Sequence, residues 1–573
     1  MNSHINRFSE EKIREVLENA YKTHLHYAPH LARVIWNRYV EAVFDANLSE
    51  IEKLREIKKL RNEIEECENL ALKEFCSVLE KIEPRAALEL LYGECNDRFA
   101  EFIAPKGSYF FSLGQCAWLI GIFGSGQNSS QQDALKAYNK YVRWLAAHLM
   151  KIHIDLRLAN DDEGSASKAV IRLELNRIVE PETRMMWISS EITISAGRWA
   201  EENSEICGIS SIFNTKVAER INKNVEDALK MSRDAAANKL SSVPMSFSAA
   251  LLSEIPCELI KQLTASHRSI SPNNVRDVIN SDEMKFHPFV KIDGVYRVLQ
   301  RACWLSQRED ALLGLCVWHS HQDVRGKVFE DVAAVLLNKW GPFDVDWSSS
   351  VDLISAQSGK KRDDVDVFGM SADCVFIGEC KANRLSQNNM SAICNFESVV
   401  LDKAVSQLSA RVAHWKEEWR PSDAESEYAS DAVGFVVTFS SYGGLLWNAT
   451  AIEVAGEKVQ LKFSIFPLYS FVLAVAALKT AAQLKGYLNS RLDAMVRGVI
   501  NSDELEHLFA YLSDVNKRLC DVPASATVLP RQYELTVEEG AYIDPRKYRN
   551  SRNWKNRYVS ELFKYSVPVT PPV

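Results

Sequence analysis

The segment between residues 364 and 382 constrains the fold of this chain more than any other. Residues 364–369 and 374–382 are two apolar runs that each contain an acidic residue, and the pattern predicts two short neighbouring strands. Because residues two apart in a strand share a face, Glu379 and Lys381 project to one side of the second strand. Charged side chains at the polar end of a buried strand need partners, and a divalent metal is the natural one.

The Glu-x-Lys triplet of residues 379–381 gains specificity from the order of the segments around it. The triplet also occurs elsewhere in the chain, but there it does not follow an apolar strand. Here a helix opens at residues 326–330, Asp366 stands between two valines, and a later helix contains Gln407. This order, which extends over residues 318–470, resembles that of the PD-(D/E)XK nuclease superfamily and implies the restriction-endonuclease-like fold.

The resemblance implies a role for five residues of this sequence. Asp366 and Glu379 would bind the metal, and Lys381 would orient or activate the attacking water. Glu330 would be a supporting acid from the first helix, and Gln407 a further site residue from the later helix. Together they define a candidate catalytic site.

The sequence departs from the family's pattern at two positions. Val365 stands where the family's name-giving proline precedes the aspartate, and Arg411 stands where a tyrosine would complete the RecB-type extension four residues after Gln407. Asp364 is the reserve candidate for the metal ligand if the strand register is shifted by two residues. Asp366 and its charged neighbours could also form a structural ion pair in an inactive descendant of the fold.

The chemistry of a phosphodiesterase explains why these residue types suit the site. Mg²⁺ prefers carboxylate oxygens and keeps several waters, so two acids leave open positions for a scissile phosphate and a nucleophilic water. Lys381 supplies positive charge where negative charge develops on the phosphate oxygens. The expected cofactor is therefore Mg²⁺, with Mn²⁺ as a substitute.

Apolar periodicity predicts the elements around this site. A helix begins at Gly326 and buries one apolar stripe, and a strand follows it before the turn that leads to Asp364. The predicted order is αβββαβ, formed by the helix from residue 326, strands over 347–356, 364–369 and 374–382, a helix over 397–419 and a strand over 433–439. A turn is expected over 357–363, and a further strand over 460–468.

The N-terminal half is predicted to be mostly helical. Residues 48–91 are rich in Glu and Lys with apolar residues at helical spacing, which favours a long exposed helix or a helical hairpin that is either a solvated bundle helix or a self-association element. Residues 121–127 lack the Gly-Lys-Ser/Thr ending of a phosphate loop and are predicted to be a turn. Further expected elements are strands over 169–176 and 185–194, helices over 215–240 and 245–263, and an Asp-Gly hairpin over 289–296.

Length and composition limit the number of domains and the kinds of partner that this chain can have. A chain of 573 residues predicts roughly three or four domains, and its formal net charge of −8 requires any nucleic-acid surface to be local. The 12 cysteines form no CxxC pair and no signal peptide is evident, which indicates reduced thiols and a cytoplasmic protein. The apolar run over residues 463–478 is interrupted by Pro467, so no membrane role is expected.

A basic, aromatic segment lies near the C-terminal end of this acidic chain. Residues 545–558 contain no acid, and the interleaving of cations with aromatic rings suits contacts with phosphates and stacked bases. A basic strip that packs on the acidic body of the protein explains the pattern equally well. The candidate nucleic-acid-binding residues are Arg546, Lys547, Arg549, Arg552, Trp554, Lys555 and Arg557.

These patterns together predict an α+β multidomain protein with a mostly helical N-terminal half followed by an αβββαβ core. We expect a helical domain over residues 1–165, a mixed α/β regulatory or recognition region over 166–294, the nuclease domain over 295–490, and a C-terminal helical extension with a basic tail over 491–573. The expected function is a Mg²⁺-dependent DNA endonuclease.

The resemblance also implies a biological setting, a restriction or phage-defence effector. A non-catalytic scaffold or nucleic-acid-binding module, and a DNA repair nuclease, remain the alternatives. DNA is the expected partner, together with a second copy of the chain through the N-terminal helices. Because no ATPase motor is visible in the sequence, a protein partner would supply any ATPase or sensing function.

Overall fold

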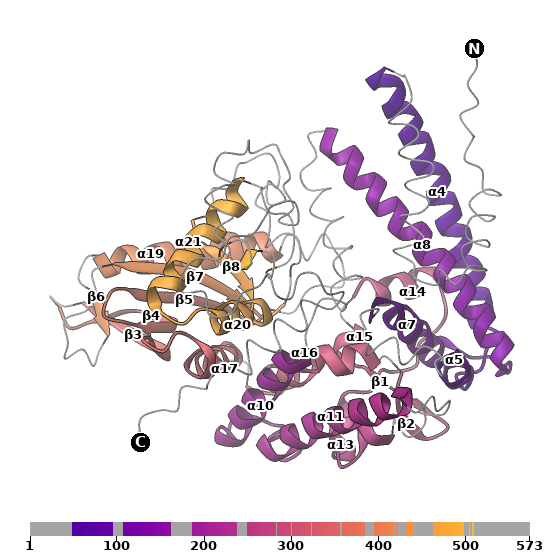
Figure 1. Ribbon diagram of the computed structural model, residues 1–573, viewed down its shortest axis with the longest axis horizontal. Coiled ribbons are helices and arrows are strands. Elements are labelled where there is room, and N and C mark those ends of the chain that lie inside the picture. Colours follow the sequence, from indigo (N-terminus) through magenta and orange to yellow (C-terminus); the bar gives the residue numbers. More distant parts are fainter. Residues whose placement is uncertain are drawn as a thin grey trace. The chain divides into compact units, whose positions relative to one another are not determined.

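The computed structural model divides the chain into two compact units. The first contains Met1–Arg184 and Lys223–Gln307, and the second contains Met185–Asn222 and Arg308–Val573. The elements of both are labelled in Figure 1. The structure describes residues 49–94, 107–161, 186–237, 249–281, 283–299, 301–321, 324–355, 358–383, 395–416, 419–421, 431–440, 442, 462–497, 504, 507–508 and 511.

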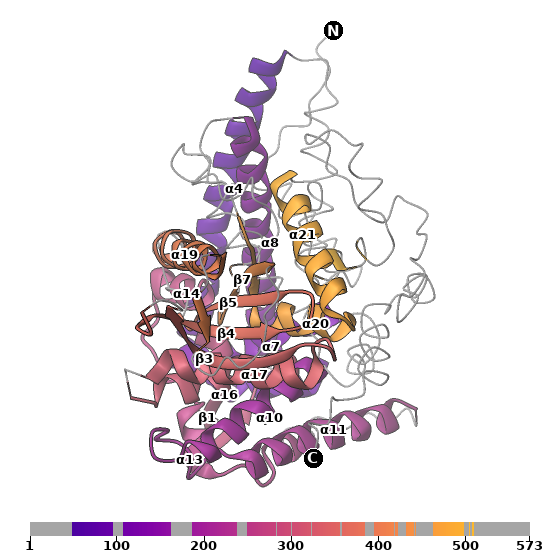
Figure 2. The ribbon, with the colours of Figure 1, turned by 90° about the vertical axis from the view of Figure 1, so that its left-hand side faces the viewer.

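The described part of the first unit is helical apart from one hairpin. Its longest helices, α4 and α8, lie side by side (Figures 1 and 2), and α4 begins with a capping box in which Ser49 and Glu52 satisfy each other's backbone N–H groups. The predicted long helix within residues 48–91 is thus confirmed. The elements are α4 Glu50–Leu79, α5 Ala86–Glu94, α7 Gly107–Phe123, α8 Gln131–Asp161, α13 Cys257–Gln262, α14 Pro272–Ile279, α15 Glu283–Phe286, β1 Phe289–Ile292 and β2 Val295–Val298.

Two short segments of the first unit match their sequence signals. The predicted Asp-Gly hairpin is confirmed, because Asp293 and Gly294 join β1 to β2 with φ angles of 52° and 78°. Positive φ at both positions is what a tight hairpin turn requires, and glycine adopts it without strain. The turn predicted at residues 121–127 is also present, since α7 ends at Phe123 and no helix resumes before Gln131.

Two predicted elements are wrong. Residues 185–194 were expected to be a strand, but they belong to the helix α10 (Met186–Glu202). Ile188, Ile192 and Ala196 are buried at a spacing of four, so the helical period explains these apolar residues as well as alternation does. The helix predicted over 245–263 is interrupted before Pro256, and only the short α13 follows it. The strand predicted over 169–176 lies outside the described residues.

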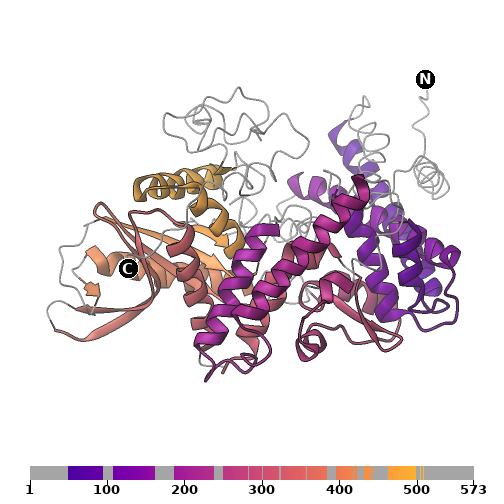
Figure 3. The same cartoon turned by 60° about the horizontal axis from the view of Figure 1, so that its bottom comes forward.

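The second unit is built around a mixed six-stranded sheet. The strand order is β6-β3-β4-β5-β7-β8, with antiparallel pairing from β6 to β5 and parallel pairing from β5 to β8. The twist of the sheet can be followed in Figure 3. The strands are β3 Asp346–Ser355, β4 Lys361–Met370, β5 Val375–Lys381, β6 Trp419–Pro421, β7 Ala432–Thr438 and β8 Ser464–Pro467.

Helices cover both faces of this sheet (Figure 2). α17 and α20 lie on one face, where Trp347, Phe376 and Phe435 pack together. α19 lies on the other face, where Trp415 contacts Phe368. The helices of this unit are α10 Met186–Glu202, α17 Arg325–Trp340, the π-helix η4 Phe396–Ala404, α19 Val405–Lys416, α20 Leu468–Ala477 and α21 Ala481–Arg497, while α11 Thr215–Ala237 and α16 Arg301–Trp318 contribute to both units.

From α17 onward the described elements follow the predicted helix, three strands, helix and strand, except that the short strand β6, which was not predicted, lies between the helix and the last strands. The α+β class is confirmed. Residues 361–363 of the expected turn extend β4, where Asp363 pairs with Leu353, and the helix predicted to reach residue 419 ends at Lys416, because Trp419 pairs with β3 as part of β6. In the part of the chain that the structure describes, no helix combines the length and apolarity needed to cross a membrane.

A side-chain amide extends the hydrogen bonding of β3. The Trp347 N–H donates to Asn338 Oδ1 at 3.1 Å, and Asn338 Nδ2 donates to the Trp347 carbonyl at 2.7 Å. Asn338 thus acts as a neighbouring strand and fixes α17 against the sheet.

We predict that Asn338→Ala destabilises the second unit by about 1–3 kcal/mol, because it leaves two backbone groups without these partners. Hydrogen exchange at the Trp347 amide should become faster. Asn203→Ala, which removes a single bond to the Trp199 carbonyl near the end of α10, is the control and should not affect Trp347. Unchanged exchange at Trp347 in Asn338→Ala would contradict this role.

Candidate functional site

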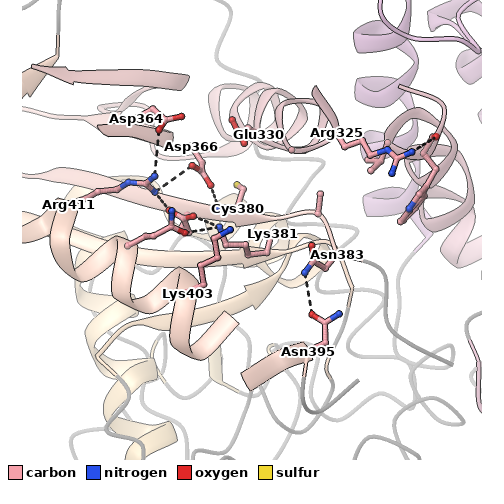
Figure 4. Close-up of a pocket in the computed structure, with 16 residues that line it drawn as sticks. Arg325, Glu330, Asp364, Asp366, Cys380, Lys381, Asn383, Asn395, Lys403 and Arg411 are labelled. Carbon is pink, nitrogen blue, oxygen red and sulfur yellow. Dashed lines mark hydrogen bonds and ion pairs between the residues drawn. The ribbon is translucent and has the colours of Figure 1, made fainter. Parts of the chain in front are cut away.

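The site lies where β4 and β5 separate. Their ladder ends at the pair Val367 and Gly378, and the next residues are Asp366 and Glu379. Past this point Asp366 Oδ2 accepts a hydrogen bond from the Cys380 N–H at 2.7 Å. A carboxylate therefore takes the place of the missing strand partner, and Figure 4 shows Asp366 directed toward Cys380. Glu379 is the residue of β5 next to Cys380, so the fork holds both acids.

A pocket of about 620 Å³ opens at this fork. All five predicted site residues line it, so the structure brings together Glu330 from α17, Asp366 from β4, Glu379 and Lys381 from β5, and Gln407 from α19. Helices from both faces of the sheet reach this end, which explains how α17 and α19 contribute to one pocket. The other charged and amide lining residues are Arg325, Asp364, Asn383, Asn395, Lys403 and Arg411.

Lys381 is held beside one of the acids. Its Nζ contacts Glu379 Oε1 and lies 3.4 Å from Gln407 Oε1. Strand alternation places Cys380 on the opposite face of β5, where burial raises the pKa of its thiol. The lysine therefore faces the pocket with a charge, whereas the cysteine is a neutral packing group.

Arg411 is the site residue whose contacts sequence reasoning missed. It follows Gln407 by one helical turn on α19 and is only 2% exposed. Its Nη1 pairs with Glu379 and lies 3.5 Å from Asp366 Oδ1, whereas its Nη2 lies 3.4 Å from Asp363 Oδ1. In the sequence, Arg411 is visible only as a departure from the family's tyrosine.

Glu330 occupies the side of the pocket formed by α17. Its Oε2 accepts from Ser350 Oγ at 3.0 Å, and Ser350 has a φ of 52°, a left-handed conformation that is costly for serine. A Cβ at Gly326, one turn earlier, would lie 3.2 Å from Glu330 Oε1. The left-handed backbone of Ser350 thus supplies a hydrogen bond to the Glu330 carboxyl, and the absence of a side chain at Gly326 leaves space for it.

Burial weakens the acidity of two of the carboxyls. It raises the pKa of Glu330 to about 7, and the negative charge of Asp366 adds to this effect. Burial also raises the pKa of Asp366, although the Cys380 N–H and Arg411 act in the opposite direction. Burial thus disfavours the charged form of these two carboxyls, and a cation bound beside them would stabilise that form.

The donor set fits a Mg²⁺ ion that keeps most of its waters. Among the described residues no group of three or more His, Cys, Asp or Glu side chains is arranged to hold a metal ion. Mg²⁺ sites in phosphoryl-transfer proteins often use only one or two carboxylates, together with water and substrate oxygens. Asp366 and Glu379 supply such a pair at the fork.

The predicted nucleic-acid-binding residues do not belong to the described part of the pocket lining. The segment from Arg546 to Arg557 lies outside the described residues. Its role stays a prediction. No family model matches the chain, and no curated protein or solved structure matches it.

The raised pKa of Glu330 predicts a pH dependence of stability. A carboxyl that binds its proton more tightly in the folded state lowers the free energy of unfolding as the pH rises from 4.5 to about 7. Glu330→Gln removes this loss. In EDTA we expect the variant to be more stable than the wild type by about 1–3 kcal/mol at pH 8, and equally stable near pH 4.5.

Urea unfolding followed by circular dichroism at several pH values measures this difference. Glu89→Gln, which changes an exposed glutamate of α5, is the matched control. Wild-type and Glu330→Gln curves that stay parallel from pH 4.5 to pH 8 would show that burial does not perturb Glu330.

Proposed function

We propose that this protein is a Mg²⁺-dependent nuclease of the PD-(D/E)XK type that hydrolyses phosphodiester bonds in DNA. One observation carries the proposal: the fork between β4 and β5 brings Asp366, Glu379 and Lys381 to one pocket. Two acids and a lysine on adjacent strands are the functional groups that metal-assisted phosphodiester hydrolysis needs.

The topology of the second unit supports the proposal. A mixed sheet with α17 on one face and α19 on the other, and with the acids on its central antiparallel pair, is the arrangement that the restriction-endonuclease-like fold implies.

Each side chain has a defined task in the proposed reaction. Asp366 and Glu379 would hold Mg²⁺, which polarises a phosphate oxygen and lowers the pKa of a bound water. Lys381, kept in place by Gln407, would stabilise the negative charge that develops on the phosphate oxygens. Glu330 lies close enough for the charge of Asp366 to raise its pKa, so it can hold a proton or a water near neutral pH.

The proposal that DNA is the substrate is based on the positive charges at the pocket and on the resemblance to the PD-(D/E)XK nucleases. The pocket also presents Arg325 and Lys403, which suit an anionic backbone. Residues 546–557, whose cations and aromatic rings suit phosphates and stacked bases, are proposed as a further DNA-binding segment. A restriction or phage-defence role, self-association through the N-terminal helices and a partner with ATPase or sensing function are further proposals that follow by analogy.

The alternative is a non-catalytic member of the same fold. The contacts of Arg411 with Glu379 and Asp366 favour it, because a guanidinium already neutralises the acids that would bind a metal. A repair nuclease that acts on DNA ends would use the same chemistry. It would differ in preferring linear over supercoiled substrates.

We predict that the purified protein nicks or linearises supercoiled DNA with Mg²⁺ or Mn²⁺ and not in EDTA. Asp366→Asn and Glu379→Gln should abolish cleavage, because an amide is a poor ligand for a hard cation. Asn at position 366 can still accept from the Cys380 N–H, so the fold should survive. Lys381→Met should slow cleavage by roughly a hundredfold to a thousandfold.

Asp352→Asn is the control for these variants. It removes an exposed carboxylate of β3 that pairs with Lys361 at 2.7 Å, and it should leave cleavage unchanged. If Asp366→Asn and Glu379→Gln cleave DNA at the wild-type rate, these two residues are not the metal ligands. Absence of cleavage by the wild type on supercoiled and linear DNA would favour the non-catalytic alternative.

A further inference from the structure

Arg411 contacts more of the acidic site than any catalytic role requires. Its guanidinium lies within 4 Å of four carboxylates, those of Asp363, Asp364, Asp366 and Glu379. Its side chain is almost fully buried, as is that of Glu379. A buried guanidinium that joins two proposed metal ligands has the charge and the position of a bound cation.

The two ends of the guanidinium face different acids. Nη1 contacts Glu379 and Asp366, the pair at the fork. Nη2 contacts Asp363 and Asp364, of which Asp364 is 58% exposed at the mouth of the pocket. The contacts of Nη1 with Glu379 and Asp366 can therefore break while Nη2 stays paired with Asp363 or Asp364 on β4.

We propose that Arg411 is a built-in competitor of the divalent cation. In the metal-free protein it pairs with Asp366 and Glu379, and a divalent cation must displace Nη1 from Glu379 before both carboxylates can bind it. This inference rests on the proposed function, because it takes Asp366 and Glu379 as the metal ligands. Arg411 is thus a positioning residue that sets how readily the site takes up metal.

Electrostatic repulsion explains why Arg411 and a divalent metal would exclude each other at the fork. Without Arg411 or a metal, two carboxylates that are 1% and 8% exposed would repel each other, and the positive charge left beside them would be Lys381 at Glu379. With both cations present, the guanidinium and the metal would repel each other at hydrogen-bond range. The most favourable arrangements therefore have one cation at the fork, either Arg411 or the metal.

Lys381 does not fit the same role. It contacts Glu379 and Gln407, and its charge also acts to lower the pKa of Asp366, but the described residues show no ion pair between Lys381 and Asp366. Arg411 thus pairs with both proposed ligands, and Lys381 pairs with one of them. The removal of Arg411 should change metal affinity in a way that the removal of other pocket cations does not.

Calorimetric titration of the full-length protein with Mn²⁺ tests the inference. Arg411→Gln should bind Mn²⁺ about tenfold or more tightly than the wild type, because no cation has to be displaced. A purely structural role for Arg411 predicts the opposite, since a disordered pair of ligands would bind more weakly. Arg411→Lys keeps the positive charge, but an ammonium cannot span the four acids. This variant should therefore bind Mn²⁺ more tightly than the wild type, by a smaller factor than Arg411→Gln does.

Two controls separate competition from a general effect of charge. Lys403→Gln removes one exposed cation from the same pocket, and its affinity should stay within about twofold of the wild type, because solvent screens an exposed charge. Glu379→Gln should abolish the titration signal and thereby show that Mn²⁺ binds at the fork. If Arg411→Gln does not fold, Arg411→Lys carries the test.

The outcomes are distinct. Tighter binding by the Arg411 variants, or binding by them alone, supports the inference. Wild-type binding that is unchanged or weakened in these variants overturns it and leaves the proposed nuclease intact. Tightening of equal size in Lys403→Gln also overturns it. Absence of Mn²⁺ binding in the wild type and in every Arg411 variant overturns both the inference and the metal site on which it rests.

Discussion

The separation of β4 from β5 after the pair Val367 and Gly378 determines where the acids of the pocket lie. While the ladder continues, alternate side chains are divided between two covered faces, and a charge there would be buried without a partner. Where the ladder ends, the Cys380 N–H needs an acceptor, and Asp366 supplies it. The same hydrogen bond that completes the strand end therefore fixes a carboxylate at the pocket.

Close packing around the fork keeps this geometry rigid. Gly378 lies against Phe435, and a Cβ there would come within 2.6 Å of the aromatic ring. Trp347 approaches Gly369 in the same way on the neighbouring strand. The aromatic layer under α17 thus holds the central strands, and the charges are confined to their ends, where α17 and α19 supply Glu330 and Arg411.

Sequence patterns predicted the parts of the site that depend on local periodicity. Alternation alone placed Glu379 and Lys381 on one face, and the Asp-Gly pair at 293–294 predicted its hairpin. Alternation failed over residues 185–194, because isoleucines four apart satisfy a helical stripe as well, and tertiary burial decided between the two.

Long-range features could not be predicted from periodicity. The contacts of Arg411 with Asp363 and Asp366 join residues 48 and 45 positions apart, and nothing in the local sequence indicates them. Ser350 has a left-handed φ and donates its hydroxyl to Glu330. The sequence does not indicate this conformation, because the residue is not a glycine. The two compact units exchange segments along the chain, and two of their boundaries fall inside the helices α11 and α16, where the sequence gives no sign of a domain border.

The central claim is that the fork between β4 and β5 is a divalent-metal site. An anomalous-scattering map from crystals grown with Mn²⁺ tests it most directly. The account predicts a peak bound by one oxygen each of Asp366 and Glu379, with Arg411 Nη1 withdrawn from Glu379. An empty fork at saturating Mn²⁺, with Arg411 still paired to Glu379, would contradict it.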